Sequence, residues 1–446
     1  MTKRHIRFIE RARELVGERF TSLMGMLFAP EELRASFERQ DKKKAPGVDG
    51  VRKADYALGL DERIADLSKR LRRLGYRPKP SRRTYVPKAS GGRRPLGVPS
   101  FEDRIVQDRL SQILQAIWEP EFRDCSYGFR PGRNAHDALR RVAEVITNGS
   151  TQWVVEADIK GFFDHVNHDH LLRFLRHRIA DPCFVRIIQR FLKAGVMEDG
   201  AVSASEEGTP QGGLVSPVLA NIYLHYVLDM WFEIRYARTC SSKAYLVRYA
   251  DDFIACFQNE EDARRFRSEL TKRLAKFDLE VEPSKTAVVR FGSGAQRNCD
   301  RDGLRRPKTF NFLGFTHYVG SSRSGRFVVG RRTEGKRFRK KLQMLNKRLR
   351  QLRVEGGKAM MDYFKRHLGG HIRYYGVSGN YRQLKAYAYW ASRLLFKWLN
   401  RRSQCRSITW ERFGKVLREG LLPRVRIVHN LYPKPLWMTQ TGSRMV

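Results

Sequence analysis

Residues 244–257 read AYLVRYADDFIACF, in which two apolar runs flank the acidic pair Asp251 and Asp252. Short apolar runs of this kind are typical of buried strands, so the stretch predicts a β-hairpin with the two aspartates at its tip. Adjacent carboxylates raise each other's pKa and destabilise a fold unless a cation lies between them. A divalent cation with oxygen ligands suits that arrangement, but an Asp pair by itself is more often simply solvated in a turn.

A third acidic residue changes this balance. Asp158 lies in the apolar stretch 153–163 (WVVEADIKGFF), which predicts a short buried strand. A carboxylate that faces a core without a partner costs several kcal/mol, so Asp158 requires a metal, a basic partner or a site. Together with Asp251 and Asp252 it would supply three carboxylates from two strands. Such a set can hold two Mg²⁺ ions for in-line attack at phosphorus.

The charge of the chain indicates a polyanionic partner. The 446 residues include 87 Lys and Arg against 47 Asp and Glu, a formal net charge of +40. Nucleic acid and an anionic membrane are the two partners that suit such a surplus. The longest apolar run, residues 213–226, is interrupted by polar residues and Pro, and it falls short of the roughly 20 apolar residues of a membrane span. Residues 1–13 lack the apolar segment of a secretory signal. We therefore expect nucleic acid and no membrane.

The basic surplus is concentrated near the end of the chain. Residues 331–446 contain 29 Lys and Arg against 5 Asp and Glu, a net charge of +24. Gly and Ser cluster at 320–330, which predicts a domain boundary there. Residues 336–353 have apolar side chains every three or four positions, which predicts a helix, and nine of these eighteen residues are basic while none is acidic.

Local patterns predict a mixed α+β core. Strands are expected at 84–86 and 153–159, in addition to the hairpin, because these stretches are short and apolar. Helical spacing of apolar residues predicts helices at 60–74, 104–118, 168–179, 216–231, 261–277 and 381–400. Strands separated by helices, without a Rossmann glycine pattern, indicate the α+β class.

Seven sequence blocks, taken in order, resemble the reverse transcriptases that bacterial group II introns encode, which are often called maturases. The resemblance covers nearly the whole chain, and seven blocks in order are far more specific than a lone YADD. It includes residues 374–380 (YYGVSGN) and the basic helices that follow the blocks. The blocks are KAPGVDG (44–50), VPKASGGRRPLGVPSFEDRIVQ (86–107), CSYGFRPGRNAHDAL (125–139), DIKGFFDHVNHDHLL (158–172), GTPQGGLVSPVLANIYL (208–224), YADDF (249–253) and NFLGF (311–315).

The resemblance implies a right-hand polymerase fold. Residues 1–80 would form an N-terminal extension and the start of the fingers, 81–320 the fingers and a palm with an antiparallel sheet, and 321–446 a helical thumb and maturase domain. No Cys and His pattern with the ligand spacing of the family's zinc-type endonuclease follows. The expectation is therefore the compact form of the family that lacks the endonuclease domain.

The resemblance also assigns roles to individual residues. Asp158, Asp251 and Asp252 would be catalytic and would hold two Mg²⁺ ions, for which Mn²⁺ is a possible substitute, with Ile159 included in the metal site. Lys88 and Arg94 would grip the incoming triphosphate, or they are solvated cations. Phe163 would pack under the deoxyribose and exclude a 2′-hydroxyl, unless both Phe162 and Phe163 are core residues.

Two further groups of residues receive candidate roles. Gln211, in the segment Pro210-Gln211-Gly212, would support the nucleotide. Arg130 and Arg133 would touch template phosphate, or they are solvated. The RNA-binding candidates in the basic part of the chain are Lys336, Lys340, Lys347, Arg350, Tyr374 and Tyr375, with Tyr381 as a third tyrosine that would stack on bases.

The predicted function is that of an RNA-directed DNA polymerase that also binds its intron RNA and assists splicing and retromobility. Its partners would be group II intron RNA, an RNA template with a DNA or RNA primer, deoxynucleoside triphosphates and target DNA. It would act in the bacterial cytoplasm, associated with the nucleoid while on DNA. Two alternatives stay open: a splicing-only RNA-binding protein with a relic polymerase core, and a reverse transcriptase recruited for phage defence, spacer acquisition or diversity generation.

Overall fold

The computed structural model describes residues 2–87, 92–198, 200–203, 207–209, 212–322, 324–401, 408–419 and 422–432. The chain divides into two compact units. The first unit contains residues 1–134, 157–253 and 264–287, and the second contains residues 135–156, 254–263 and 288–446. Each unit is therefore assembled from separate stretches of sequence.

One long helix forms the core of the first unit. α6 (Phe101–Trp118) begins at Ser100, whose hydroxyl accepts a hydrogen bond from the Asp103 N–H, and thirteen of its eighteen residues are buried. This helix carries apolar side chains on nearly all sides, which is typical of a central helix rather than a surface one. The helices that pack on α6 are α1 (Lys3–Glu14), α2 (Met24–Leu27), α3 (Pro30–Arg39) and α10 (Ser216–Leu224).

The first unit contains further helical elements. Two π-helical turns, His225–Asp229 and Trp231–Tyr236, directly follow α10, so the helix that we expected at 216–231 is wider after residue 224. Wide turns of this kind often occur at functional sites. The other helical elements are α4 (Lys53–Ala57), α5 (Leu60–Arg72), η1 (Phe162–Asp164), α8 (His168–Arg176), α9 (Pro182–Lys193), η4 (Ala237–Thr239) and η5 (Pro283–Lys285). α11 (Glu260–Ala275) starts in the second unit and ends in the first.

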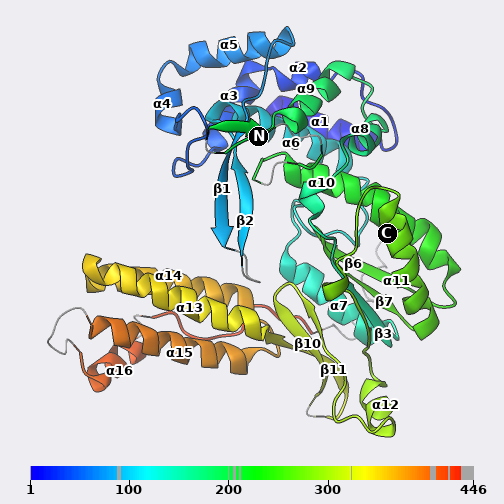
Figure 1. Ribbon diagram of the computed structural model, residues 1–446, viewed down its shortest axis with the longest axis vertical. Coiled ribbons are helices and arrows are strands. Elements are labelled where there is room, and N and C mark those ends of the chain that lie inside the picture. Colours follow the sequence, from blue (N-terminus) through cyan, green and yellow to red (C-terminus); the bar gives the residue numbers. More distant parts are fainter. Residues whose placement is uncertain are drawn as a thin grey trace, which may run out of the picture. The chain divides into compact units, whose positions relative to one another are not determined.

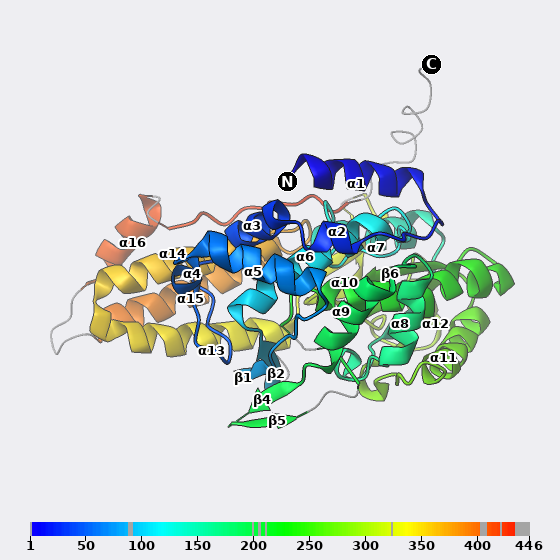
Figure 2. The ribbon, with the colours of Figure 1, turned by 90° about the horizontal axis from the view of Figure 1, so that it is seen from above.

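A mixed four-stranded sheet projects from these helices in the order β2-β1-β4-β5 (Figures 1 and 2). β1 (Ser81–Pro87) and β2 (Arg93–Val98) are antiparallel, with Val86 opposite Arg94. β4 (Val196–Glu198) adds to β1 in parallel, and β5 (Ala201–Ser203) pairs antiparallel with β4. The strand that we expected at 84–86 is thus part of β1, and distant chain segments extend the sheet that it forms with β2.

A second four-stranded sheet has the order β6-β7-β3-β8. Its strands are β6 (Tyr245–Tyr249), β7 (Asp252–Phe257), β3 (Trp153–Ala157) and β8 (Ala287–Arg290). The Gln152 N–H donates to the Phe257 carbonyl, so the start of β3 lies beside the end of β7. The two strands are therefore antiparallel, and the end of β3 lies beside the start of β7.

The second unit combines an antiparallel sheet with a group of helices. The sheet has the order β11-β10-β9, with β9 (Phe310–Phe312), β10 (Phe315–Ser321) and β11 (Phe327–Thr333). Helices α13 (Gly335–Leu352), α14 (Gly357–Tyr375) and α15 (Tyr381–Leu399) pack side by side (Figure 1), and Leu345, Leu349 and Leu395 are fully buried among them. The unit also contains α7 (Ala135–Asn148), α12 (Ala295–Arg301), η6 (Arg353–Glu355) and α16 (Trp410–Arg418).

These elements confirm the α+β class. The boundary that we expected at 320–330 falls on the β10–β11 hairpin, so the Gly and Ser cluster there forms a turn within one unit.

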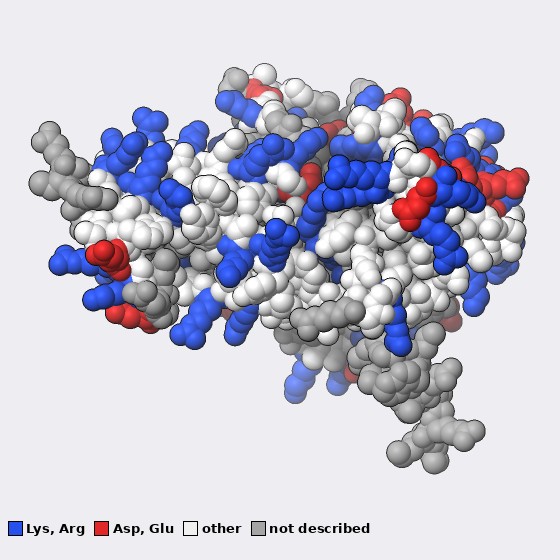
Figure 3. Space-filling view, turned by 90° about the horizontal axis from the view of Figure 1, so that it is seen from below, with Lys and Arg blue, Asp and Glu red and all other residues white. Residues whose placement is uncertain are grey.

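No helix in the described part of the chain is long and apolar enough to cross a membrane. Lys and Arg side chains occur over much of the face in Figure 3, whereas acidic side chains are few there.

Candidate active site

The acidic pair lies at the tip of a tight hairpin, as the sequence predicts. β6 ends at Tyr249 and β7 begins at Asp252, so only Ala250 and Asp251 form the turn. Ala250 has a φ of 58°, in the left-handed region that residues with a Cβ rarely adopt. A backbone of this kind persists only when its surroundings hold it in place.

A buried arginine holds this turn from inside. Arg248 and Asp229 are both 0% exposed, and the Arg248 Nε donates to the Asp229 Oδ1 at 2.7 Å. Arg248 Nη1 donates to the Ala250 carbonyl at 3.0 Å, which fixes the carbonyl of the strained residue. The remaining donations go to the Asn221 Oδ1, the Ser126 Oγ and the second Asp229 oxygen, so all five guanidinium donors have acceptors.

Electrostatics favour a charged Arg248 in spite of its burial. Burial lowers the pKa of Arg248, but the Asp229 carboxylate raises it more, so the pKa lies above its ordinary value. The charge of Asp251 raises it further. Asp251 therefore lies within the electrostatic influence of this buried cation, which offsets part of the repulsion between the adjacent carboxylates.

Residues 125–128 of the third block support the outer side of the hairpin. The Arg248 N–H donates to the Cys125 carbonyl, and the Tyr127 N–H donates to the Arg248 carbonyl, both at 2.8 Å. Gly128 lies against the turn so closely that a Cβ there would be 2.4 Å from the Ala250 nitrogen. Asn221 donates to the Gly128 carbonyl at 2.7 Å. A glycine is required at position 128 because any side chain would displace the turn.

The two arginines with a possible template role have structural partners in this region. Arg130 is 6% exposed, and its guanidinium donates to Glu119 and to the carbonyls of Arg123 and Ser126. Arg133 donates to the Ser126 carbonyl and to Asp124. Neither role that we considered for Arg130, a template contact or a solvated charge, fits these contacts. Arg130 instead fixes the segment that supports the hairpin. Arg133 contacts the same segment but its side chain is 25% exposed, so its contact with template phosphate stays a prediction.

Asp158 reaches the same end of the sheet from the neighbouring strand. It directly follows β3, and the end of β3 lies beside Asp252 at the start of β7. The Glu282 N–H donates to the Asp158 carbonyl at 2.8 Å, and Ile159 forms an antiparallel bridge with Val281. These contacts hold the backbone of Asp158, whose side chain is 16% exposed.

Lys285 is the cationic partner that a partly buried Asp158 requires. Its Nζ contacts the Asp158 Oδ2, from the end of the η5 turn. Partial burial lowers the pKa of Lys285, but the contact with Asp158 and the charges of Glu282 and Asp252 raise it above its ordinary value. Because both Asp158 and Asp252 act on Lys285, the two carboxylates face a common region.

The donor set suits a hard divalent cation, but its members are not gathered into a complete site. Carboxylate oxygens are the ligands that Mg²⁺ prefers. In the described ranges, no three His, Cys, Asp or Glu side chains lie close enough together to hold a metal ion. The Ile159 side chain is 2% exposed, so only its backbone carbonyl could take part. The bridge with Val281 uses the N–H of Lys160 and the carbonyl of Asp158, and not the Ile159 carbonyl.

The two phenylalanines after Asp158 have different environments. Phe162 is 2% exposed and packs against Tyr223, whereas Phe163 is partly exposed. The Phe163 carbonyl accepts a hydrogen bond from the Thr209 N–H, and Gly208 packs against Asp164. Phe162 is therefore a core residue, and Phe163 is the ring that remains available to a ligand.

Three of the nucleotide-binding candidates lie largely outside the described residues. Lys88 and Gln211 are not described, and of Arg94 only the backbone is described, in β2 opposite Val86. The segment just after Gln211 is described: a Cβ on Gly212 would lie 2.5 Å from the Gly97 carbonyl oxygen of β2. This contact places the fifth sequence block beside the β1–β2 hairpin.

The RNA-binding candidates divide into exposed cations and buried tyrosines. Lys336, Lys347 and Arg350 on α13 are exposed, and Lys340 is partly exposed. Tyr375 is 2% exposed, and Tyr374 is half-buried with its hydroxyl donating to the Leu313 carbonyl at 2.8 Å. The stacking role that we expected for Tyr375 is therefore wrong, because its ring lies in the core between α14 and the neighbouring sheet. The stacking role of Tyr374 stays a prediction. Tyr381 is 49% exposed.

The sequence analysis missed the residues that hold the site. Arg248 had a signal, because a charge in the middle of an apolar strand requires a buried partner. Nothing local identifies that partner as Asp229, nineteen residues earlier. Lys285 had no signal at all, since it meets Asp158 only in the folded chain.

Comparisons with known proteins agree with the geometry. Residues 86–317 match the family described as reverse transcriptase (RNA-dependent DNA polymerase). Similar proteins include YkfC of Escherichia coli (strain K12), 42% identical over 194 residues, which are 43% of this chain and 51% of that protein. The group II intron-encoded protein LtrA of Lactococcus lactis subsp. cremoris is 38% identical over 221 residues, 49% of this chain and 36% of that protein.

A third similar protein comes from a yeast. An uncharacterised 91 kDa protein in the cob intron of Schizosaccharomyces pombe is 47% identical over 156 residues, 34% of this chain and 19% of that protein. The chain spans about half or less of the length of these curated relatives.

The buried ion pair of Arg248 and Asp229 leads to a prediction about the stability of the protein. Asp229→Asn leaves the Arg248 charge buried without a counter-charge, which should cost about 3–5 kcal/mol. For a unit of this size, the melting temperature should fall by about 10 °C, as measured by circular dichroism. The control is Asp302→Asn, which breaks the exposed pair with Arg290 and should cost less than about 1 kcal/mol. Equal effects of the two substitutions would contradict the role assigned to the pair.

Proposed function

This chain belongs to the reverse transcriptase (RNA-dependent DNA polymerase) family, and from that premise we propose that it extends a DNA or RNA primer along an RNA template with deoxynucleoside triphosphates. The observation that carries this proposal is the supported turn. It presents Asp251 and Asp252 beside the end of the strand that leads into Asp158. Phosphoryl transfer needs little covalent chemistry from a protein, so positioning and charge stabilisation account for most of the catalysis.

We propose that Asp158, Asp251 and Asp252 hold divalent cations, with Ile159 adding its carbonyl. Enzymes of this family generally use divalent metal ions, and Mg²⁺, in two sites, is the ion that the all-oxygen donor set favours, with Mn²⁺ as a substitute. Such ions activate the attacking hydroxyl and neutralise the leaving pyrophosphate. Because Asp158 contacts Lys285, a metal ligand role for Asp158 requires this contact to loosen.

Nucleotide binding is assigned to residues of three sequence blocks. We propose that Lys88 and Arg94 on the β1–β2 hairpin bind the triphosphate and that Gln211 supports the nucleotide. Phe163 would exclude a 2′-hydroxyl, and its partial exposure beside the buried Phe162 supports this choice of ring. The contact of Gly212 with Gly97 supports a common pocket, because it brings the segment after Gln211 to the strand that contains Arg94.

The second unit is proposed to bind group II intron RNA and to assist splicing and retromobility at a DNA target. The names of LtrA and of the Schizosaccharomyces pombe protein both refer to an intron. Residues 331–446 have a net charge of +24, and α13 presents exposed cations over 18 residues. Phosphate contacts provide affinity through the release of counterions, so such a helix suits RNA. Residues 81–320 would be fingers and palm and 321–446 thumb and maturase domain, acting in the cytoplasm and at the nucleoid.

The first prediction of this proposal concerns the carboxylates. Asp251→Asn or Asp252→Asn should abolish primer extension on an RNA template while RNA binding stays nearly unchanged, because affinity depends on cations elsewhere. Extension assays and filter binding on the same protein provide the measurement, with Asp302→Asn as the control. Residual extension within about tenfold of the unmodified chain, a loss of only about 1.4 kcal/mol, would remove these residues from the metal site.

The second prediction concerns sugar selection. Phe163→Val should raise the incorporation of ribonucleotides relative to deoxyribonucleotides, because a smaller side chain leaves room for the 2′-hydroxyl. The measurement is the ratio of kcat/KM for the two nucleotides, and Phe162→Val is the matched control. If the control shifts the ratio and Phe163→Val does not, the ring has been assigned wrongly.

The third prediction separates RNA binding from polymerisation. Reversing the exposed charges Lys336, Lys347 and Arg350 to Glu should weaken binding to intron RNA and reduce the slope of its salt dependence by about one unit for each lost phosphate contact. Splicing in vitro should decline with it, whereas Asp252→Asn should still support splicing. The control reverses Arg267 and Lys272, two exposed cations of α11, and the exposed Lys276 that directly follows this helix. Loss of splicing in Asp252→Asn but not in the α13 variant would contradict this separation of RNA binding from polymerisation.

A further inference from the structure

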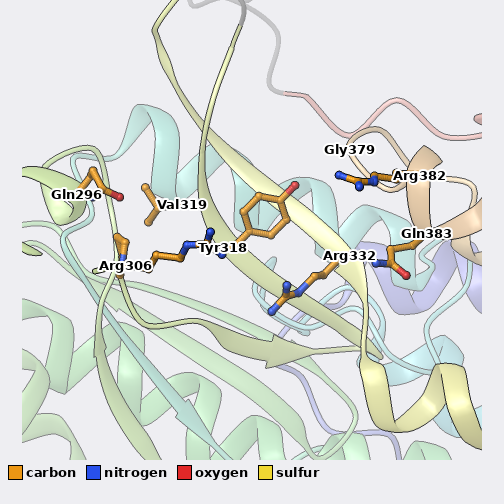
Figure 4. A pocket seen from close by; sticks show the side chains of 9 residues that line it. Gln296, Arg306, Tyr318, Val319, Arg332, Gly379, Arg382 and Gln383 are labelled. Carbon is orange, nitrogen blue, oxygen red and sulfur yellow. The ribbon is translucent and has the colours of Figure 1, made fainter. Parts of the chain in front are cut away.

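A cationic cavity lies entirely within the second unit and has no role in the site described above. It has a volume of about 410 Å³ and is lined by segments that are far apart in sequence (Figure 4). Arg306 lies before β9, Tyr318 belongs to β10, Arg332 belongs to β11, and Arg382 belongs to the first turn of α15. None of the nine lining residues is acidic. A cavity of this size is within the range of small-ligand sites.

The three arginines of the cavity differ from the structural arginines of the chain. Arg248, Arg130 and Arg109 are each paired with a carboxylate. Arg306, Arg332 and Arg382 are exposed, and none of them forms an ion pair with a carboxylate of the described residues. Three like charges that converge without an internal counter-ion repel one another, so an external anion is the partner that stabilises them. Guanidinium groups favour phosphate because their planar donors match its oxygens.

The aromatic residue of the cavity is positioned by a glycine. Tyr318 lies across β11 at Gly330, where a Cβ would be 2.3 Å from the tyrosine ring. Only glycine leaves the space that the ring occupies, so the strand pairing of Tyr318 with Gly330 sets the orientation of this side chain. Figure 4 shows the ring between Arg306 on one side and Arg332 and Arg382 on the other. A ring flanked by cations is the arrangement that stacks on a base while its phosphates are neutralised.

The start of α15 adds to the positive potential of the cavity. Arg382 and Gln383 lie in the first turn of this 19-residue helix, which has no acidic residue there. The side chain of the N-cap residue, Asn380, bonds to Thr333 and the Tyr375 carbonyl and not to the helix amides. The partial positive charge of the helix start therefore supplements that of the arginines.

We propose that this cavity binds one nucleotide unit of a single-stranded nucleic acid, with the base on Tyr318 and the flanking phosphates on Arg306, Arg332 and Arg382. The inference rests on the proposed function, since it names a contact for a strand that a reverse transcriptase handles. A free mononucleotide has the same chemistry and is the other source of such a ligand. The cavity is distinct from the carboxylate site because all of its lining residues belong to the second unit.

The test compares two variants of the full chain that lose the same charge. The cavity variant carries Arg306→Gln, Arg332→Gln and Arg382→Gln, and the control carries Lys358→Gln, Arg366→Gln and Arg412→Gln, three exposed cations of α14 and α16. The probe is a fluorescent single-stranded RNA, and its affinity is measured by anisotropy over a series of salt concentrations. The cavity variant should bind at least about tenfold more weakly than the control, with a slope smaller by about two units, as three lost contacts to a single strand predict.

A second measurement locates the contact directly. RNA that contains 4-thiouridine is crosslinked to the unmodified chain by light, and the peptide that contains Tyr318 should carry the crosslink. Tyr318→Phe should retain affinity, whereas Gly330→Val, which displaces the ring, should reduce both the affinity and the crosslink. Equal affinities of the cavity and control variants, or a crosslink that never includes residues 315–333, would overturn the proposal.

Two further outcomes separate this inference from its premises. Displacement of the RNA by a mononucleotide at micromolar concentration would show a free nucleotide site and overturn the strand assignment. Primer extension by the unmodified chain is measured in parallel. Absence of extension together with the Tyr318 crosslink would contradict the proposed function and leave the cavity site standing. Extension without the crosslink would overturn the cavity site and leave the proposed function standing.

Discussion

The buried ion pair between Arg248 and Asp229 is the interaction on which the candidate active site depends. A lone charge in this interior would be prohibitive, and the pair is tolerated because every guanidinium donor has an acceptor. The same guanidinium bonds to the carbonyl of Ala250, whose left-handed backbone makes the two-residue turn possible. The pair thus connects the core helices to the turn that carries the two carboxylates.

Several blocks of the sequence gain a common explanation from this arrangement. The Ser126 hydroxyl accepts a hydrogen bond directly from Arg248, whereas Gly128 packs against the turn and is joined to Arg248 through Asn221. The π-helical turn after α10 ends at Asp229 and so delivers the counter-charge. Gly128 and Asn221 are therefore part of one support for the hairpin. Lys285 contacts Asp158, and the negative charge of Asp252 also raises the pKa of Lys285.

The sequence was informative where local pattern decides the outcome and uninformative where long-range contacts do. Apolar runs around Asp251 and Asp252 predicted the hairpin, and helical spacing predicted α6, α13 and α15 within a few residues. The pattern could not show that Arg130 is buried and paired with a carboxylate, or that Tyr375 is buried. Arg and Tyr occur both at the surface and, when their polar groups have partners, in the interior. The Gly and Ser cluster near 320–330 had the composition of a linker but the geometry of a hairpin turn. The RNA-binding and nucleotide-binding assignments remain predictions.

The central claim is that the Arg248 support positions the carboxylates for polymerisation. Single-turnover primer extension by Asp229→Asn tests it most directly, under conditions in which circular dichroism shows the variant to be folded and RNA binding shows it to be saturated. We expect the rate at saturating deoxynucleotide and divalent metal to fall by at least about 100-fold, roughly 2.7 kcal/mol, because the turn loses its fixed carbonyl. An unchanged rate in the folded, RNA-bound variant would contradict the account.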